Sequence, residues 1–308
     1  MGLIQEIFPG RMQEKMECLN SKLQMIQELR IRVNAPVMVR SCAKEYYITS
    51  CGTLTNSIWE GEVFTAKNLE EIVLHICHSS IYAYEEELKK GYITIPGGHR
   101  VGVAGQAVID EFGQMKTIKN ISFLNVRVAH EVIGAGNELL PYIYKNGRIQ
   151  NTLVISPPGY GKTTFLRDLI RQVSEGNRFG EARHCCVIDE RSEIAGSYRG
   201  IPQMQLGRRT DILDACPKAV GMMMAIRSMS PQVIAVDELG TKADIEALFS
   251  VIRLGCNIFA TIHGDDIYSL KKGSFLKEIL QEKVFDRYVV ICNRQHNFEV
   301  FDGEYHKC

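Results

Sequence analysis

The strongest chemical signal in the sequence is a glycine-rich segment, Ser156-Pro-Pro-Gly-Tyr-Gly-Lys-Thr-Thr164. It matches the phosphate-loop pattern G-x-x-x-x-G-K-S/T except at the first position, where Ser156 replaces glycine. The glycines at 159 and 161 allow consecutive backbone N–H groups to face one anion. Lys162 can reach the β- and γ-phosphates of a nucleotide and act in catalysis there, and the Thr163 hydroxyl can bind Mg²⁺. The alternative is a glycine-rich turn between a strand and a helix in which the lysine is accidental. The candidate ATP-binding residues are Ser156, Pro157, Pro158, Gly159, Tyr160, Gly161, Lys162, Thr163 and Thr164.

Two adjacent acids follow the apolar run 233–236 and are candidates for the chemistry of hydrolysis. Asp237 is expected to be the metal ligand that completes the magnesium site with Thr163. Glu238 is expected to polarise the attacking water. An Asp-Glu pair after a strand can also serve only to cap a helix.

Polar residues follow two further apolar runs. After the run that ends at Asp189, Glu190 and Glu193 either share in water activation or pair with Arg191 and nearby lysines in a surface turn. After a later run, His263 is a candidate to sense the γ-phosphate together with Thr261, although a lone histidine is more often structural. Residues 207–211, Gly-Arg-Arg-Thr-Asp, fit an anion-binding loop or a helix N-terminus with solvated arginines equally well.

These candidate residues must be positioned by the second half of the chain, which alternates short apolar runs with helix-length segments. The runs are 152–156, 184–189, 232–237 and 257–261. Strands that are apolar throughout are typical of a parallel sheet covered on both faces. Ligands bind at the carboxyl edge of such a sheet, where the polar residues that end these runs are expected to lie. Residues 287–293 and 298–302 are predicted to form an antiparallel pair at the margin of the sheet.

The first half has a different pattern, which predicts a mixed α+β domain. A helix is expected over 11–28, strands over 36–40 and 45–49, one or two helices over 67–90, and extended segments from 92 to 128. A helix near 136–145 is followed by a segment of little periodicity at 146–150. We therefore predict an N-terminal α+β domain, 1–147, and a RecA-like P-loop NTPase domain with a mainly parallel sheet, 148–308.

Composition limits the class of protein. The chain has 308 residues, 36 Lys and Arg against 36 Asp and Glu, and 45% hydrophobic residues, as expected for a globular protein of two domains. Zero net charge disfavours a protein that coats nucleic acid by bulk electrostatics. No apolar run approaches the ~20 residues that span a bilayer, and the N-terminus does not resemble a signal peptide. Ten cysteines without a C-x-x-C pair indicate reduced cytosolic thiols, not a zinc site.

Taken together, these motifs resemble those of the type II/IV secretion ATPases, and most closely the sporulation branch of that family. The resemblance covers about residues 148–265, with the phosphate loop, the acidic box 189–193, Asp237-Glu238 and Thr261-Ile-His263. Arg227-Ser-Met-Ser-Pro231 and Glu246-Ala247 fit further landmarks of the family. In the first half, residues 28–36 and 97–102 are similar to signatures of the sporulation branch.

The resemblance implies a Mg²⁺-dependent ATPase that forms a homo-oligomeric, hexameric ring, with ATP held between the two domains. It also implies a membrane-embedded secretion or sporulation complex as partner, bound from the cytoplasmic face on the mother-cell side, and no specific nucleic acid. Such rings use an arginine from a neighbouring subunit, which can raise the rate ~10³–10⁵-fold. The candidates here are Arg30, Arg32, Arg100 and Arg127.

Two other functions remain open at this stage. One is a nucleic-acid-dependent P-loop ATPase, for which Gly102-Val-Ala-Gly105 supplies only a weak G-x-x-G match. The other is an ATP-dependent assembly scaffold with little turnover.

Overall fold

The computed structural model describes residues 2–42, 44–268, 276–293 and 297–308. These residues form two compact units, Met1–His130 and Glu131–Cys308. The predicted boundary, between 147 and 148, lies later in the chain. The difference arises because Leu140 and Ile143 are buried in the same cluster as Val154 and Phe165, so the segment before residue 148 packs with the second unit.

The first unit is built on an antiparallel sheet in the order β5-β4-β3-β1-β9-β8-β7. Its strands are β1 (Ile26–Arg32), β3 (Met38–Ser41), β4 (Lys44–Ile48), β5 (Leu54–Thr55), β7 (Tyr92–Ile95), β8 (His99–Ile109) and β9 (Met115–Arg127), and a small pair is formed by β2 (Ala35–Pro36) and β6 (Val63–Phe64). The helices are α1 (Leu3–Ile7), α2 (Gly10–Met16), η1 (Glu17–Met25), η2 (Ile58–Glu60), α3 (Ala66–Ile76), η3 (Ile81–Tyr84) and α4 (Glu85–Lys89).

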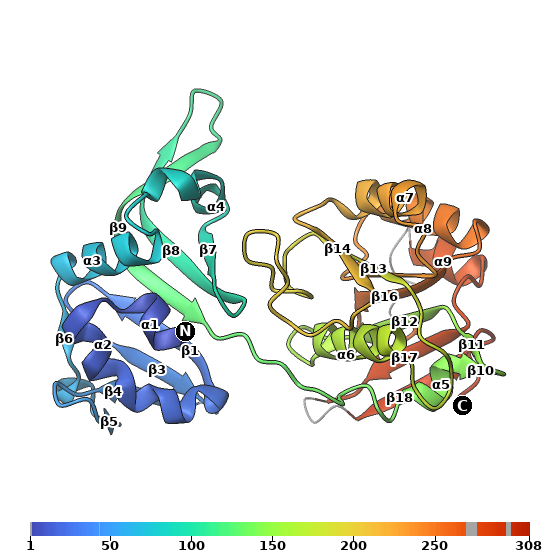
Figure 1. The fold of residues 1–308 in the computed structure, drawn as a ribbon, viewed down its shortest axis with the longest axis horizontal. Coiled ribbons are helices and arrows are strands. Elements are labelled where there is room, and N and C mark those ends of the chain that lie inside the picture. Colours follow the sequence, from blue (N-terminus) through green and yellow to red (C-terminus); the bar gives the residue numbers. More distant parts are fainter. Residues whose placement is uncertain (1, 43, 269–275, 294–296) are drawn as a thin grey trace. The chain divides into compact units, whose positions relative to one another are not determined.

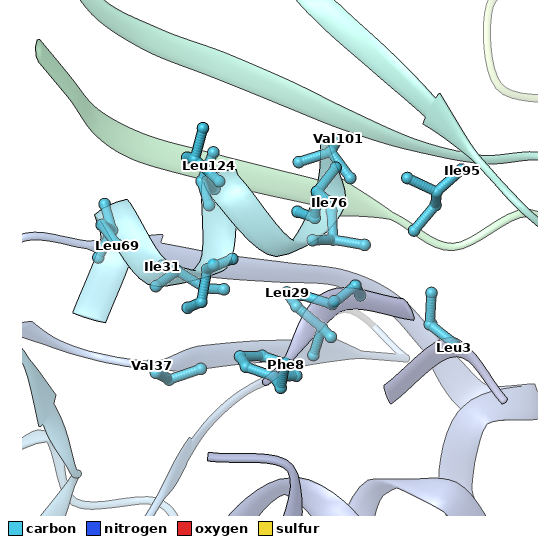
Figure 2. Close-up of a cluster of buried hydrophobic side chains, with 14 of the residues drawn as sticks. Leu3, Phe8, Leu29, Ile31, Val37, Leu69, Ile76, Ile95, Val101 and Leu124 are labelled. Atoms are coloured by element: carbon cyan, nitrogen blue, oxygen red, sulfur yellow. The ribbon is translucent and has the colours of Figure 1, made fainter. Parts of the chain in front are cut away.

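One face of this sheet is covered by helices and forms the core of the first unit. Helix α3 begins at a capping box in which the Thr65 hydroxyl accepts the Asn68 N–H. Its buried residues recur at a helical spacing, from Leu69 to Ile76. Figure 2 shows these two side chains against Ile31, Leu124 and other apolar residues of the sheet. The opposite face carries Arg30 and Arg32 together with the apolar side chains of Met38 and Phe123, which the register places beside them.

The helix expected over 11–28 is shorter than predicted. Helix α2 ends at Met16, a 3₁₀ helix follows to Met25, and β1 starts at Ile26. The buried residues Ile26, Leu29 and Ile31 suit a strand because β1 pairs with β3 on one side and β9 on the other. Pairing with distant strands therefore overrides the local helical spacing.

The second unit is an α/β fold with a mostly parallel sheet, as predicted. The strand order is β14-β13-β15-β16-β12-β17-β18, and β17 and β18 form the predicted antiparallel pair. The strands are β10 (Tyr144–Lys145) and β11 (Arg148–Ile149), which pair with each other, and β12 (Thr152–Ser156), β13 (Cys185–Asp189), β14 (Thr210–Asp214), β15 (Val233–Val236), β16 (Asn257–His263), β17 (Arg287–Ile291) and β18 (Phe298–Asp302). The helices are α5 (Leu140–Ile143), α6 (Lys162–Glu175), α7 (Lys218–Ser228), α8 (Lys242–Arg253) and α9 (Leu276–Gln281).

Both faces of this second sheet are covered, which explains why its strands are apolar throughout. Figure 1 shows α6 on one side and α7 and α8 on the other. In β12, Val154 belongs to the cluster with α6, and Leu153 and Ile155 belong to the cluster with α7 and α8. This arrangement brings the carboxyl ends of β12, β13, β15 and β16 to one edge.

Residues 207–211 differ from both predicted alternatives. Thr210 and Asp211 begin strand β14, which pairs in parallel with β13 at the edge of the sheet. The two arginines precede this strand: the backbone N–H groups of Arg208 and Arg209 donate to the side chains of Glu175 and Ser174 at the end of α6. The segment therefore joins an edge strand to α6.

None of the helices in the described ranges is both long enough and apolar enough to cross a membrane.

Candidate nucleotide-binding site

The phosphate loop connects β12 to α6 and has the backbone conformation that its glycines permit. Gly159 and Gly161 have φ values of 78° and 93°. These lie in the positive-φ region, which residues with a side chain rarely adopt. Gly161 is the N-cap of α6, and Lys162 is the first residue of the helix. The free N–H groups and the positive end of the helix dipole at this position favour an anion. Ser156 is fully buried as the last residue of β12, so the loop proper begins after it.

Asp237 lies at the end of β15 and accepts hydrogen bonds from two threonines. The Thr163 hydroxyl, in the first turn of α6, donates to Asp237 Oδ2 at 2.8 Å. The Thr261 hydroxyl, on β16, donates to Asp237 Oδ1. Mg²⁺ in nucleotide sites takes one or two protein oxygens and completes its shell with phosphate and water. The Thr163 hydroxyl and the Asp237 carboxylate are oxygen donors already in contact, so the residues present fit this ion.

Lys162, His263 and Glu238 form a continuous chain of hydrogen bonds. The Lys162 Nζ lies 2.9 Å from His263 Nδ1, and His263 Nε2 lies 2.9 Å from Glu238 Oε1. The ammonium can only donate, so Nδ1 accepts a hydrogen bond from it and Nε2–H donates to the carboxylate. Strand register explains the contact, because Ser156, just before the loop, is paired with His263 across β12 and β16.

The Lys162 ammonium is largely buried, with 8% of the residue exposed. Burial lowers the pKa of Lys162, and the carboxylates of Asp237, Glu238 and Glu193 oppose this change. A buried cation with an uncharged acceptor as its hydrogen-bond partner retains a strong attraction for an anion. The site is therefore suited to triphosphate.

Glu238 is held from two sides and has a strained backbone. Besides His263, its carboxylate accepts a bond of 2.8 Å from Arg191 Nη1. Its φ is 56°, which is unusual for a residue with a side chain. The backbone N–H of Glu238 donates to the Thr261 hydroxyl at 2.8 Å, so the same threonine fixes both acids of the pair. Strain of this kind persists only where the surroundings impose it, and it concentrates at functional positions.

The acidic box after β13 has one structural and two accessible carboxylates. Asp189 is 1% exposed, and its oxygens accept the backbone N–H groups of Glu193 and Ala195, each at 2.8 Å. Burial raises the pKa of Asp189, and these bonds oppose the rise. Glu190 pairs instead with Lys218 at the start of α7. Glu190, Glu193, Asp237 and Glu238 line one small hollow, so the structure brings together all the acids predicted for the site.

Several residues that support the site were not predicted. The buried Arg167, one turn after Thr163 on α6, donates to the backbone oxygens of Ile194 and Glu193 at 2.7 and 2.9 Å and so holds the acidic box against the helix. Lys218 and Thr241 line a pocket of about 640 Å³ beside the site, which also includes Glu190, Arg191, Glu238 and His263. The spacing of Arg167 from Thr163 was visible in the sequence, but its carbonyl partners were not.

Comparison with known proteins assigns the chain to a family. The family described as "Sporulation stage III, protein AA" matches residues 2–307. The chain belongs to this family. The stage III sporulation protein AA of Bacillus subtilis (strain 168) is 43% identical over 290 residues, covering 94% of this chain and 90% of the relative. The uncharacterized protein ycf45 of Cyanidium caldarium is 28% identical over 222 residues, covering 71% of this chain and 60% of the relative.

Solved structures show the same fold as this sporulation protein at low sequence identity. The ATPase DotB of Yersinia pseudotuberculosis has a TM-score of 0.61 and 16% identity, covering 97% of this chain and 81% of that one. The pilus retraction motor PilT with bound ADP has a TM-score of 0.61 and 13% identity, covering 94% and 78%. At such identity the likeness is one of fold, and it agrees with the predicted resemblance to secretion ATPases.

In this sporulation protein, the four candidate arginines of the first unit share one face of its sheet. The register places Arg30 opposite Asn125 in β9, and Arg32 two residues further on the same side. Arg100 of β8 lies opposite Arg127 of β9, which is itself opposite Glu28. This is the face not covered by helices. Arg30 and Arg32 also line a hollow of about 420 Å³ on it, and Arg30 pairs with Glu28 at 2.9 Å.

Proposed function

We propose that this member of the sporulation family binds and hydrolyses ATP with Mg²⁺. The observation that carries the proposal is the contact between the Thr163 hydroxyl and the Asp237 carboxylate at the end of the phosphate loop. Backbone N–H groups from Gly159 onward and the Lys162 ammonium bind the phosphates. Thr163 and Asp237 hold the metal ion, which when bound neutralises charge on the phosphate oxygens.

The three glutamates of the site, Glu190, Glu193 and Glu238, orient and deprotonate the attacking water. Glu238 stands at the end of β15, next to Asp237, and polarises the attacking water, with Glu190 and Glu193 facing the same hollow. His263 Nδ1 is a hydrogen-bond partner of the Lys162 ammonium. When phosphate oxygens take over this ammonium, His263 Nδ1 is freed, and the histidine responds to the presence of a γ-phosphate.

The test of this function is ATP turnover and nucleotide binding by purified protein. Lys162→Ala should lose both, whereas Glu238→Gln should bind ATP with little change and lose turnover. Lys145→Ala, at an exposed lysine of β10, is the matched control and should behave as the unchanged protein. Turnover by Lys162→Ala equal to that of the control would overturn the proposal.

We further propose that the protein acts as a ring-forming motor that energises a membrane channel or secretion apparatus needed for sporulation, from the cytoplasmic side of the mother cell. The sporulation relative and the secretion-ATPase fold support this role. In a ring, the arginine face of one copy would serve the nucleotide of a neighbour. Specific activity should then rise with protein concentration in parallel with oligomer mass. Constant activity from a monomer would exclude a shared site.

A scaffold with slow turnover is the second candidate, and one observation favours it. Each carboxylate oxygen of Glu238 already accepts a hydrogen bond, one from Arg191 and one from His263, and these bonds compete with the polarisation of a water molecule. In a scaffold, Lys162→Ala would abolish assembly while Glu238→Gln would leave assembly intact. Nucleic-acid binding has no comparable support, because Gly102–Gly105 lies within strand β8.

A further inference from the structure

The guanidinium of Arg191 contacts Glu238 and has no role in the steps proposed so far. Its Nη1 donates to Glu238 Oε2 at 2.8 Å, and His263 binds the other carboxylate oxygen. Arg191, Asp237 and Glu238 line the same small hollow. All of these residues belong to the second unit. A cation of the chain itself therefore lies beside the acid pair without help from another copy.

The backbone around Arg191 is held on both sides. The Ser192 hydroxyl donates to Asp214 Oδ1 at 2.6 Å, and Ser192 takes a φ of 52°. One residue later, the N–H of Glu193 donates to the buried Asp189 carboxylate at 2.8 Å. This turn fixes the point from which the Arg191 side chain starts.

The side chain of Arg191, in contrast, is exposed and has room to move. It is 64% exposed, against 28% for the Glu238 side chain. It also borders the pocket of about 640 Å³ beside the hollow. An ion pair in contact with water is weak because solvent screens it. A γ-phosphate carries more negative charge than a carboxylate, so a bound triphosphate can take the guanidinium from Glu238.

We propose that Arg191 is a catalytic arginine supplied in cis, whose guanidinium leaves Glu238 Oε2 for the γ-phosphate oxygens when ATP is bound. The inference rests on the proposed ATPase function and deepens it. The exchange frees a carboxylate oxygen of Glu238 for the attacking water. An arginine presents two N–H donors to one phosphate group, and in cis it can stabilise the charge of the transition state.

Arg191 neither gains nor loses a proton in the reaction. The oxygen of water forms a bond to the γ-phosphorus while the bond from that phosphorus to the β–γ bridging oxygen breaks. The electron pair of the broken bond stays on ADP, and Glu238 takes a proton from the water. The N–H groups of Arg191 stabilise negative charge on the γ-phosphoryl oxygens. Arg191 acts in addition to any arginine that a neighbouring copy supplies.

Lys218 lines the same hollow but suits this role less well. It is the first residue of α7 and pairs with Glu190. Its side chain is only 11% exposed, so it has less freedom to move than that of Arg191. A lysine is also a point charge, whereas the fork of a guanidinium binds two phosphate oxygens. Arg191 is therefore the better candidate.

ATP turnover by the purified full chain with Arg191→Met tests the proposal. Arg208→Met is the control, because Arg208 lies in the same connection between β13 and β14 and its side chain is 90% exposed. We expect kcat of the Arg191 variant to fall ~100-fold or more, with an affinity for ADP equal to that of the control. If Arg191 only restrained Glu238, its removal would leave kcat unchanged or raise it. Either of these results would overturn the proposal.

Binding of a transition-state mimic distinguishes contact with the γ-phosphoryl group from a structural role. ADP with aluminium fluoride resembles ATP during transfer of that group. Arg191→Met should bind this mimic ~100-fold more weakly than the control does and should bind ADP alone equally well. An equal loss for both ligands would contradict the contact. If the unchanged protein binds nucleotide but does not turn over ATP, the ATPase function fails and this inference fails with it. Normal turnover by Arg191→Met overturns this inference alone.

Mixed oligomers test whether Arg191 acts in cis. Chains with Arg191→Met and chains with Lys162→Ala are produced together with different tags, and both tags are used in the purification. Each intact phosphate loop can then have a neighbour with an intact Arg191. We expect turnover no higher than that of Arg191→Met alone, and recovery would overturn the assignment in cis. If the chain is a monomer, the loss of turnover in Arg191→Met establishes the action in cis directly.

Discussion

Thr163 and Asp237 are 74 positions apart in the chain, and the hydroxyl of the first donates to the carboxylate of the second at 2.8 Å. The contact exists because α6 starts at the edge of the sheet where β15 ends. It joins the phosphate loop to the acid pair. The predictions below follow from this contact and its neighbours.

Asp237→Asn should weaken binding of ATP in the presence of Mg²⁺ by roughly tenfold, about 1.4 kcal/mol, because an amide is a poorer magnesium ligand than a carboxylate. When a chelator removes Mg²⁺, the substitution should change ATP binding much less. A titration with a fluorescent ATP analogue, with and without Mg²⁺, checks both. Asp211→Asn, at an exposed carboxylate of the edge strand β14, is the control. An equal loss with and without Mg²⁺ would argue that Asp237 does not hold the ion.

His263→Ala should destabilise the nucleotide-free chain, because the buried Lys162 ammonium loses its acceptor. The cost of an unsatisfied buried polar group is about 1–3 kcal/mol. ADP should remove most of this difference, since phosphate oxygens replace the imidazole as partner of the ammonium. Thermal unfolding of both proteins with and without ADP measures this. The interpretation fails if ADP raises the melting temperature of both proteins equally.

Arg167→Met should loosen the acidic box without touching the nucleotide. The change leaves the backbone carbonyls of Ile194 and Glu193 without the guanidinium donor. We expect a loss of about 2–3 kcal/mol in the free energy of unfolding and faster hydrogen exchange across residues 190–195. Arg148→Met, at an exposed arginine of β11, should change neither. Slow exchange across this loop in the Arg167 variant would show that other contacts hold it.

The first unit should lose stability as the pH falls below neutral. Burial lowers the pKa of His99 from about 6.5 to about 4, with His130 adding to the effect. The Nδ1 of His99 accepts the Ala129 N–H at 3.0 Å, so the folded state needs the neutral ring. Between these pKa values the unfolded chain binds more protons, and stability therefore rises with pH across that window.

The size of this effect can be tested with an uncharged substitute. From pH 7 to pH 5 the protonation of His99 should cost about 2 kcal/mol at most. His99→Asn keeps an acceptor but does not titrate, so its unfolding should depend less on pH over this range. Denaturant unfolding of both proteins at the two pH values provides the comparison. Parallel pH dependences would exclude His99 as the source.

Much of the second unit could be predicted because its strands are apolar on both faces. Val154 and Ile155 point into different clusters, so an uninterrupted apolar run was a reliable sign of a covered parallel strand. Strand β1 could not be predicted in the same way. Ile26 and Leu29 also fit a helical spacing, and only their pairing with β3 and β9 decides between the two. Strand β14 was missed for a different reason, because its residues are only partly buried and do not form an apolar run.

The types of residue in the site could be predicted, but their pairing could not. The position of each acid after a strand places it at the carboxyl edge, which is a local property of the chain. Arg191 meets Glu238 because β13 and β15 are neighbours, and Lys162 meets His263 because β12 and β16 are neighbours. That order is set by packing of the whole sheet. The sequence therefore predicted which side chains gather at this edge of the sheet and left their pairing open.

The most direct measurement is a crystal structure of the protein with a non-hydrolysable ATP analogue and Mg²⁺. We predict the β- and γ-phosphates against the N–H groups of Gly159–Thr163 and the Lys162 ammonium. The Thr163 hydroxyl should lie at the ~2.0–2.1 Å typical of a magnesium ligand, with Asp237 bound directly or through one water. A nucleotide bound elsewhere, or a filled loop whose metal ion is remote from Asp237, would contradict the account.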